Sequence, residues 1–107
     1  MGERLDFDVA VEHLDDRVVV RVEGDLDMGS AQAFEDAMSP VGSAPHVVID
    51  LSECTFLDSA GMRLIATTVR HAARVSVVAT DPGILRVLAI TAMDRMVVVH
   101  ASLEDAL

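Results

Sequence analysis

The first part of the chain alternates between apolar and polar residues, which is the pattern of a strand with one buried face. Residues 5–12 place an apolar side chain at every second position, and residues 17–23 repeat this alternation with three valines. The segment His13–Asp16 between them has the length and polarity of a hairpin turn. The chain is therefore predicted to open with two antiparallel strands.

After residue 30 the apolar residues recur every three or four positions, which predicts helices that alternate with buried strands. Ser39-Pro40 ends the first helix, because the residue before a proline is pushed out of the helical region. Asp81-Pro82 supplies an N-cap and a proline at the first helical position. The predicted helices run from Ser30 to Met38, from Ser59 with a polar stripe that ends at Arg74, and from Pro82 to Ala92. The strands that alternate with them cover residues 46–51, 75–79 and 96–100. A short segment over 102–105 matches a capping box, and it needs to pack on the body of the domain to form a stable helix.

This order of elements predicts an α/β domain with a mixed central sheet, mostly parallel and antiparallel at its N-terminal edge. The strands over 46–51 and 75–79 are apolar on both faces, as parallel strands covered by helices are. A chain of 107 residues has the usual length of one domain, so we expect residues 1–107 to form a single domain around one core.

Charge and cysteine content exclude several classes of function. The net charge is −10, with eight arginines and no lysine, and such a surface repels nucleic-acid phosphates and anionic lipids. The longest apolar runs have about five residues, whereas a membrane-spanning helix needs about 20. The lone Cys54 excludes an intrachain disulfide, and the four histidines lack the spacing of metal ligands. We therefore expect a cytoplasmic protein that binds neither nucleic acid nor membrane and needs no metal or cofactor.

The segment Asp50–Met62 runs from a buried strand through a loop into a helix, and open α/β sheets place their sites in such loops. Ser59 falls where an N-cap residue is expected, so one interpretation is that its hydroxyl only caps the helix. Gly61 has no β-carbon and would let another backbone approach closely. The fragment Leu57–Gly61 lacks the first glycine of the G-x-S-x-G elbow, so a hydrolase is not predicted.

Three short motifs occur in a defined order along the chain. They are Val22–Asp27, then Val48–Ser52 followed after a spacer by Phe56–Gly61, and finally Arg86–Thr91. Together they resemble the signature of the STAS domain, the family of bacterial anti-sigma factor antagonists and of the cytoplasmic tails of sulphate transporters. The resemblance covers nearly the whole chain and implies a STAS-like fold with helices packed mainly on one side of the sheet. At this length the chain is similar to the antagonists rather than to a transporter tail.

The resemblance also implies a mechanism of regulation. In antagonists of this family an anti-sigma factor that is itself an ATP-using serine kinase phosphorylates the serine of the Asp-Ser-x-Gly loop, and the matching residue is Ser59. The unphosphorylated form binds that kinase and frees the sigma factor. Ala60 stands where several family members carry a second hydroxyl, which leaves Ser59 as the only hydroxyl of the loop motif. The implied protein is a regulator and not an enzyme, with partner contacts at Asp25, Asp27, Asp58, Ser59, Ala60, Gly61, Met62 and Arg63.

Simpler interpretations remain open for several of these residues. Asp25 and Asp27 either contact the partner or cap the first helix. Arg63, Arg70 and Arg74 form either a docking face for an acidic partner or a solvated helix face. The alternative function is a scaffold module that binds partners in a signalling complex and is never phosphorylated.

Overall fold

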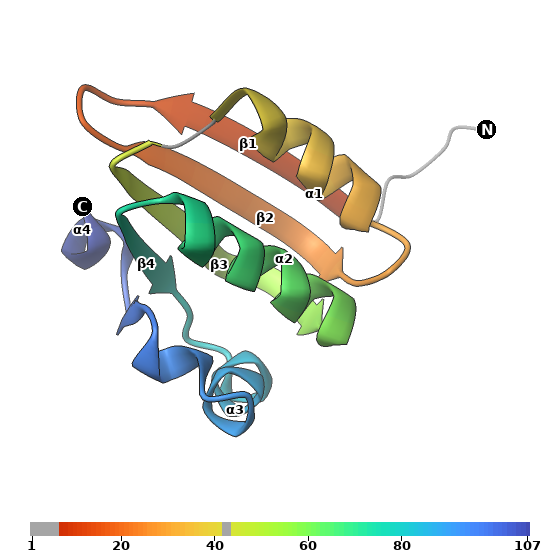
Figure 1. Cartoon of the computed structure of the whole chain (residues 1–107). Coiled ribbons are helices and arrows are strands. Elements are labelled where there is room, and N and C mark those ends of the chain that lie inside the picture. The colour runs from red at the N-terminus through yellow and green to blue at the C-terminus, as the bar shows by residue number, and fades with distance from the viewer. Residues whose placement is uncertain (1–6, 42–43) are drawn as a thin grey trace.

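A mixed sheet forms the centre of the molecule (Figure 1). The computed structural model describes residues 7–41 and 44–107, so the predicted strand residue Leu5 lies outside the described residues. Within them the strands are β1 (Phe7–His13), β2 (Val18–Leu26), β3 (His46–Leu57), β4 (Arg74–Val78) and β5 (Val98–His100), in the spatial order β1-β2-β3-β4-β5. β1 pairs with β2 in antiparallel fashion, and the other neighbours are parallel. The predicted mixed, mostly parallel sheet is confirmed.

The helices pack mainly on one face of this sheet, as predicted. Their bounds are Ala31–Met38 (α1), Ser59–His71 (α2), Pro82–Ile90 (α3) and Leu103–Ala106 (α4), with 3-10 turns at Ser39–Val41 (η1) and Met93–Arg95 (η2). α1, α2 and α3 bury Phe34, Ile65 and Leu88 in one common core. Figure 1 shows α1 and α2 side by side in front of the sheet. α4 covers the opposite face.

Alternation along the valine-rich strands supplies both faces of the sheet. Val18, Val20 and Val22 of β2 point into the main core, together with the apolar residues of β3 and β4 that share their face. Val19, Val48 and Val78 point the other way and pack against Ala106 of α4. Because this second contact buries Ala106 to 2% exposure, the short C-terminal helix gains the tertiary support that four residues need.

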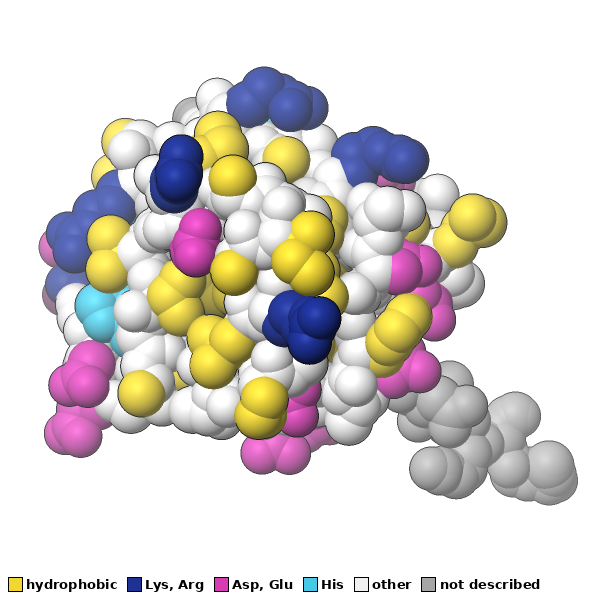
Figure 2. Space-filling model, turned by 90° about the horizontal axis from the view of Figure 1, so that it is seen from below, with side chains coloured by type: hydrophobic (Ala, Val, Ile, Leu, Met, Phe, Trp, Pro, Cys, Tyr) yellow, Lys and Arg dark blue, Asp and Glu magenta, His cyan; other side chains and the backbone are white. Residues whose placement is uncertain are grey.

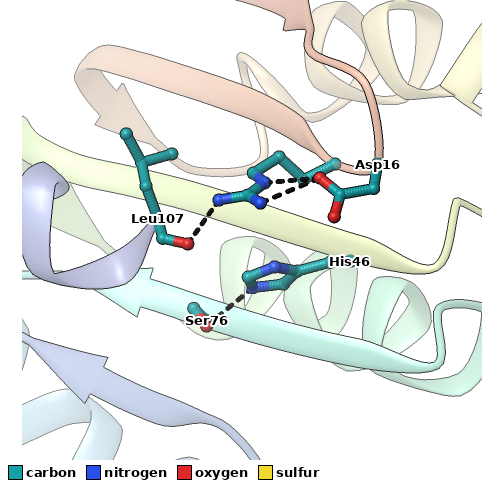
Figure 3. Close-up of polar contacts among 5 residues, drawn as sticks. Asp16, His46, Ser76 and Leu107 are labelled. Atoms are coloured by element: carbon teal, nitrogen blue, oxygen red, sulfur yellow. Dashed lines mark hydrogen bonds and ion pairs between the residues drawn. The ribbon is translucent and has the colours of Figure 1, made fainter.

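Polar contacts also fasten the C-terminal end to the second face (Figure 3). Arg17 donates from Nη1 to the carbonyl oxygen of Leu107 and from Nε to Oδ1 of Asp16 at 2.9 Å. The Arg17 guanidinium lowers the pKa of the Asp16 carboxyl below its ordinary value. On the same face, His46 Nε2 lies 3.0 Å from Ser76 Oγ. Burial lowers the pKa of His46, and the cations Arg74 and Arg17 add to this shift.

Several element boundaries differ from the prediction. β3 continues to Leu57 instead of ending at Leu51, because its second half pairs with the end of β2 up to the Leu26–Leu57 pair. The helix from Ser59 ends at His71, and Arg74 begins β4, so Arg74 does not belong to the stripe of Arg63 and Arg70. The final strand is also shorter than predicted and begins at Val98.

The lower surface of the molecule carries apolar side chains among arginines (Figure 2). On α3 and the segment that follows it, Ile90 is 72% exposed and Met96 is 58% exposed. In the part of the chain that the structure describes, no helix is long and apolar enough to cross a membrane.

Candidate functional site

β2 and β3 end together at one edge of the sheet, and the two segments that carry the predicted site residues start there. Leu26 and Leu57 are the last paired residues of the two strands. The next residues form the β2–α1 turn and the start of α2, which Figure 1 shows at the same end of the sheet. The Asp58 N–H donates to the Leu26 carbonyl oxygen at 3.4 Å, which ties the two segments together. This carboxyl edge is where open α/β sheets place their sites.

Asp58, and not Ser59, caps α2. Its Oδ1 accepts hydrogen bonds from the N–H groups of Ala60 at 2.9 Å and Gly61 at 3.0 Å. Its backbone is extended, as an N-cap requires, whereas Ser59 is already the first helical residue. The prediction that Ser59 is the N-cap is therefore wrong by one residue, because the longer carboxylate reaches two N–H groups at once.

The Ser59 side chain is consequently exposed and uncommitted. Within residues 7–41 and 44–107 its hydroxyl makes no hydrogen bond, and its neighbour Asp58 is half-buried. A capping serine would have its oxygen turned toward the helix end. Ser59 instead stands free at the first turn of α2, where an approaching protein can reach it.

Gly61 explains why α2 can start so close to β2. A β-carbon at this position would lie 2.5 Å from the Leu26 carbonyl oxygen and 2.7 Å from Leu57 Cδ1. Carbon atoms do not approach a backbone oxygen this closely, so only glycine fits without movement. The expectation that Gly61 permits a close backbone approach is confirmed.

The β2–α1 turn is held by its own side chains. Asp27 Oδ1 accepts from the N–H groups of Gly29 at 2.9 Å and Ser30 at 3.2 Å. The Ser30 hydroxyl donates to the Asp25 carbonyl oxygen at 2.7 Å. α1 begins after Ser30, so Asp27 shapes the turn before the helix and is not its N-cap. Its carboxylate remains half-buried beside the edge.

Asp25 does not bond to the N–H groups at the start of α1, as a capping residue would. Its Oδ1 accepts a hydrogen bond from the Thr55 hydroxyl at 2.6 Å, across the β2–β3 pair. Both residues are exposed. Gly24 precedes Asp25 with a φ of 92°, in the left-handed region that favours glycine, and the β2–β3 register shifts at this point. The bulge thus presents Asp25 and Thr55 on the surface next to the α2 start.

The other predicted contacts divide into surface and core. Arg63 is exposed one turn into α2, and Ala60 is half-buried. Met62 is only 7% exposed and Gly61 is buried, so these two residues support the edge from inside and offer little surface to a partner.

Sequence reasoning missed two exposed apolar residues at this edge. Phe56, at the end of β3, is 50% exposed, and Met28, in the β2–α1 turn, is 79% exposed. The sequence predicts a loop after Leu51, and the irregular burial of residues 52–57 within β3 gives no local signal that Phe56 is exposed. Exposed large apolar residues flanked by carboxylates are typical of docking surfaces.

Cys54 lies in β3 and not in a loop. It is 3% exposed, and its Sγ donates to the Phe56 carbonyl oxygen at 3.3 Å. Burial raises the pKa of the thiol, and the carboxylates of Asp25 and Asp81 raise it further. Among the described residues no group of three or more His, Cys, Asp or Glu side chains is placed to hold a metal ion.

Comparison with known proteins decides the family. The family described as "Mlab, STAS domain" matches residues 9–99. The chain belongs to the STAS-domain family. The STAS match covers all five strands except the ends of β1 and β5, and it includes the whole edge described above.

Two mycobacterial proteins are similar to this STAS domain over most of its length. The anti-sigma-F factor antagonist RsfB of Mycobacterium tuberculosis is 30% identical over 94 residues, which are 83% of this chain and 77% of RsfB. The crystal structure of an anti-sigma factor antagonist from Mycobacterium paratuberculosis superimposes with a TM-score of 0.87 at 35% identity, over 94% of this chain and 90% of that one.

The same STAS fold occurs in a more distant protein. SpoIIAA, an anti-sigma factor antagonist, has a TM-score of 0.78 in its unphosphorylated form, at 20% identity over 92% of both chains. Its phosphorylated form, described as a Bacillus cell fate determinant, has a TM-score of 0.70 at 19% identity over 92% of this chain and 96% of that one. At these identities the likeness concerns the fold.

Proposed function

We propose that this STAS domain is an anti-sigma factor antagonist that binds a kinase-type anti-sigma factor while Ser59 is unphosphorylated. Phosphorylation of Ser59 by that ATP-using kinase would dissociate the complex. The names of the mycobacterial relatives support the antagonist role. In this proposal the protein acts by binding rather than by catalysis, and it works in the cytoplasm, where sigma factors act.

The observation that carries the proposal is the free Ser59 hydroxyl at the carboxyl edge of β2 and β3. We call this edge, formed by the β2–α1 turn and the first turn of α2, the docking edge. Its position after the Asp58 cap leaves the hydroxyl exposed, at the same edge of the sheet as the Asp25–Thr55 hydrogen bond, and Arg63 lies one turn further along α2. A hydroxyl used as a cap would need to leave the helix before it could be phosphorylated. The Ser59 hydroxyl can accept a phosphoryl group without breaking a contact of the fold.

A phosphate at Ser59 would act on the partner mainly through charge. It adds about −1.5 to −2 charges, beside the Asp58 carboxylate. The N–H groups of Ala60 and Gly61 are already bonded to Asp58, so they are not free to neutralise it. At an effective dielectric constant of about 20, a like-charge pair about 4 Å apart costs about 4 kcal/mol. Loss of affinity by at least about a hundredfold is therefore expected when a partner covers this edge.

Two substitutions at Ser59 test the proposal. Ser59→Ala removes the acceptor but not the cap, so it should fold normally, bind the kinase-type anti-sigma factor and stay bound when ATP is added. Ser59→Asp places a permanent carboxylate at the edge, so it should fold and lose binding. Affinity would be measured by calorimetry with and without ATP, and phosphate would be located by mass spectrometry.

The matched control is Ser39→Asp, which adds the same charge to an exposed serine after the C-terminal end of α1. It should bind like wild type. If wild type acquires no phosphate at Ser59 and Ser59→Asp binds as tightly as wild type, the switch is refuted and the domain is a binding module that is not phosphorylated. A binding module of this kind would use the docking edge in the conformation that the unmodified protein already has.

A further inference from the structure

A hollow lies between the C-terminal halves of α1 and α2. It has a volume of about 520 Å³, within the range of about 300–1,000 Å³ typical of small-molecule sites. Its apolar walls come from α1, α2 and the start of β3, and comprise Phe34, Met38, Val47, Leu64 and Ala72. Phe34 and Val47 at the floor are each 1% exposed. We call this hollow the α1–α2 groove.

The polar atoms of α2 in this groove are already committed as donors. Thr68 Oγ1 donates to the Leu64 carbonyl oxygen at 3.1 Å, and Thr67 Oγ1 donates to the Arg63 carbonyl oxygen at 3.0 Å. A hydroxyl has one hydrogen, so each of these oxygens can only accept a further bond. His71 Nδ1 lies 2.8 Å from the Thr67 carbonyl oxygen, and because a carbonyl only accepts, Nδ1 carries the proton. In the neutral ring Nε2 is then an acceptor.

The carboxylate of Glu35 at the rim of the groove also favours a ligand that donates hydrogen bonds and carries a positive charge. Glu35 of α1 lines the groove, and its carboxylate is an acceptor that carries a negative charge. The arginines of α2 are not among the lining residues, but the Arg70 guanidinium donates to Thr67 Oγ1 at 3.2 Å and places a positive charge beside that oxygen, so Thr68, His71 and Glu35 are the acceptors that remain for a ligand. The net charge of −10 adds a long-range attraction for cations.

We propose that the α1–α2 groove binds a small organic ammonium compound with an apolar, preferably aromatic, body. The body would lie on Phe34 and Leu64, and the ammonium group would donate to Glu35 and to the acceptors of α2. A carboxylate ligand would meet acceptors and a like charge, so it should bind much more weakly.

This site is distinct from the docking edge. The groove reaches β3 at Val47, whereas Ser59 follows the other end of that strand at Leu57. Along α2 the nearest lining residue is Leu64, five residues or about 7.5 Å of helix after Ser59, and the groove extends from there past the C-terminal end of the helix to Ala72. The proposal therefore stands whether or not Ser59 is phosphorylated.

Three probes with one naphthyl body test the preference for a cation: 2-(1-naphthyl)ethylammonium, 2-(1-naphthyl)ethanol and 1-naphthylacetate. The chain has no Trp or Tyr, so naphthyl fluorescence polarisation reports binding without protein background. The ammonium compound should bind most tightly, the alcohol more weakly and the carboxylate most weakly. If the carboxylate binds as tightly as the ammonium compound, or if no probe binds up to its solubility limit, the proposal is refuted.

Two pairs of variants locate the binding. Ala72→Phe fills the groove and should abolish binding, whereas Ala73→Phe, next to it but outside the lining, should leave binding unchanged. Glu35→Gln should weaken the ammonium compound about two- to fivefold and leave the alcohol unaffected, and Asp36→Asn is its control. Thermal melts would establish that each variant folds. If Ala72→Phe does not fold, the comparison of Glu35→Gln with Asp36→Asn alone tests whether the probe binds in the groove. Equal effects within either pair would place the probe elsewhere, for instance on the exposed apolar surface of α3, and would overturn the assignment.

Discussion

Gly61→Ala should destabilise the domain even though alanine is a better helix former than glycine. The added β-carbon would lie 2.5 Å from the Leu26 carbonyl oxygen, which belongs to a paired strand and cannot rotate away. Forcing a methyl group into a filled site costs about 1–3 kcal/mol. The gain in helix propensity offsets at most about 1 kcal/mol of this cost. The expected net loss is about 1–2 kcal/mol, or about 5–15 °C in melting temperature for a domain of this size.

Gly83→Ala is the matched control for this prediction. Gly83 also lies in the first turn of a helix that an aspartate caps, but its β-carbon would meet only the Asp81 carboxylate, at 3.0 Å. A side chain can move by a few tenths of an ångström where a strand cannot, so the melting temperature should change by a few degrees at most. Both variants would be followed by circular dichroism and by calorimetry. If Gly61→Ala melts at the wild-type temperature, the contact between α2 and β2 is looser than the structure shows and the reasoning fails.

Three further predictions follow from single residues. Asp58→Ala should cost about 1 kcal/mol through loss of the N-cap, whereas Asp58→Asn should keep the cap and remove only the charge, so the two melting temperatures should differ. Cys54 should react with a thiol reagent far more slowly in the native protein than in denaturant, because burial raises its pKa and blocks access; equal rates would contradict the buried position. Burial lowers the pKa of His46, so the unfolded chain binds more protons, and the stability present above about pH 6.5 is lost as the pH falls further. Melting temperatures at pH 8 and pH 5.5 should therefore differ less in His46→Asn than in wild type, and an unchanged difference would exclude His46 as a source.

Much of the fold could be predicted because local patterns and tertiary packing agree. Alternating apolar and polar residues predicted β1 and β2, and the spacing of apolar residues predicted α1, α2 and α3. Asp81 was placed correctly as an N-cap because Pro82 fixes the first helical position. At α2 two good capping residues, Asp58 and Ser59, stand next to each other, and sequence alone does not choose between them.

The second half of β3 could not be predicted for a physical reason. The register shift at Gly24 breaks the alternation, and residues 52–57 alternate irregularly between buried and exposed positions. Pairing with the end of β2, which is a contact distant in sequence, determines that this segment is a strand. The exposure of Phe56 and the Asp25–Thr55 hydrogen bond depend on the same pairing, so neither could be derived from the local sequence.

The seating of the first turn of α2 on β2 also affects the thermodynamics of association. Because Gly61 contacts Leu26 and the Asp58 N–H is bonded to it, the backbone at the docking edge is ordered before any partner arrives. A partner therefore pays for ordering exposed side chains, about 0.5–1.5 kcal/mol each, and not for ordering a loop. Little rearrangement is needed on encounter. A charge added to such a preorganised surface is expected to shorten the lifetime of the complex rather than to reshape the domain.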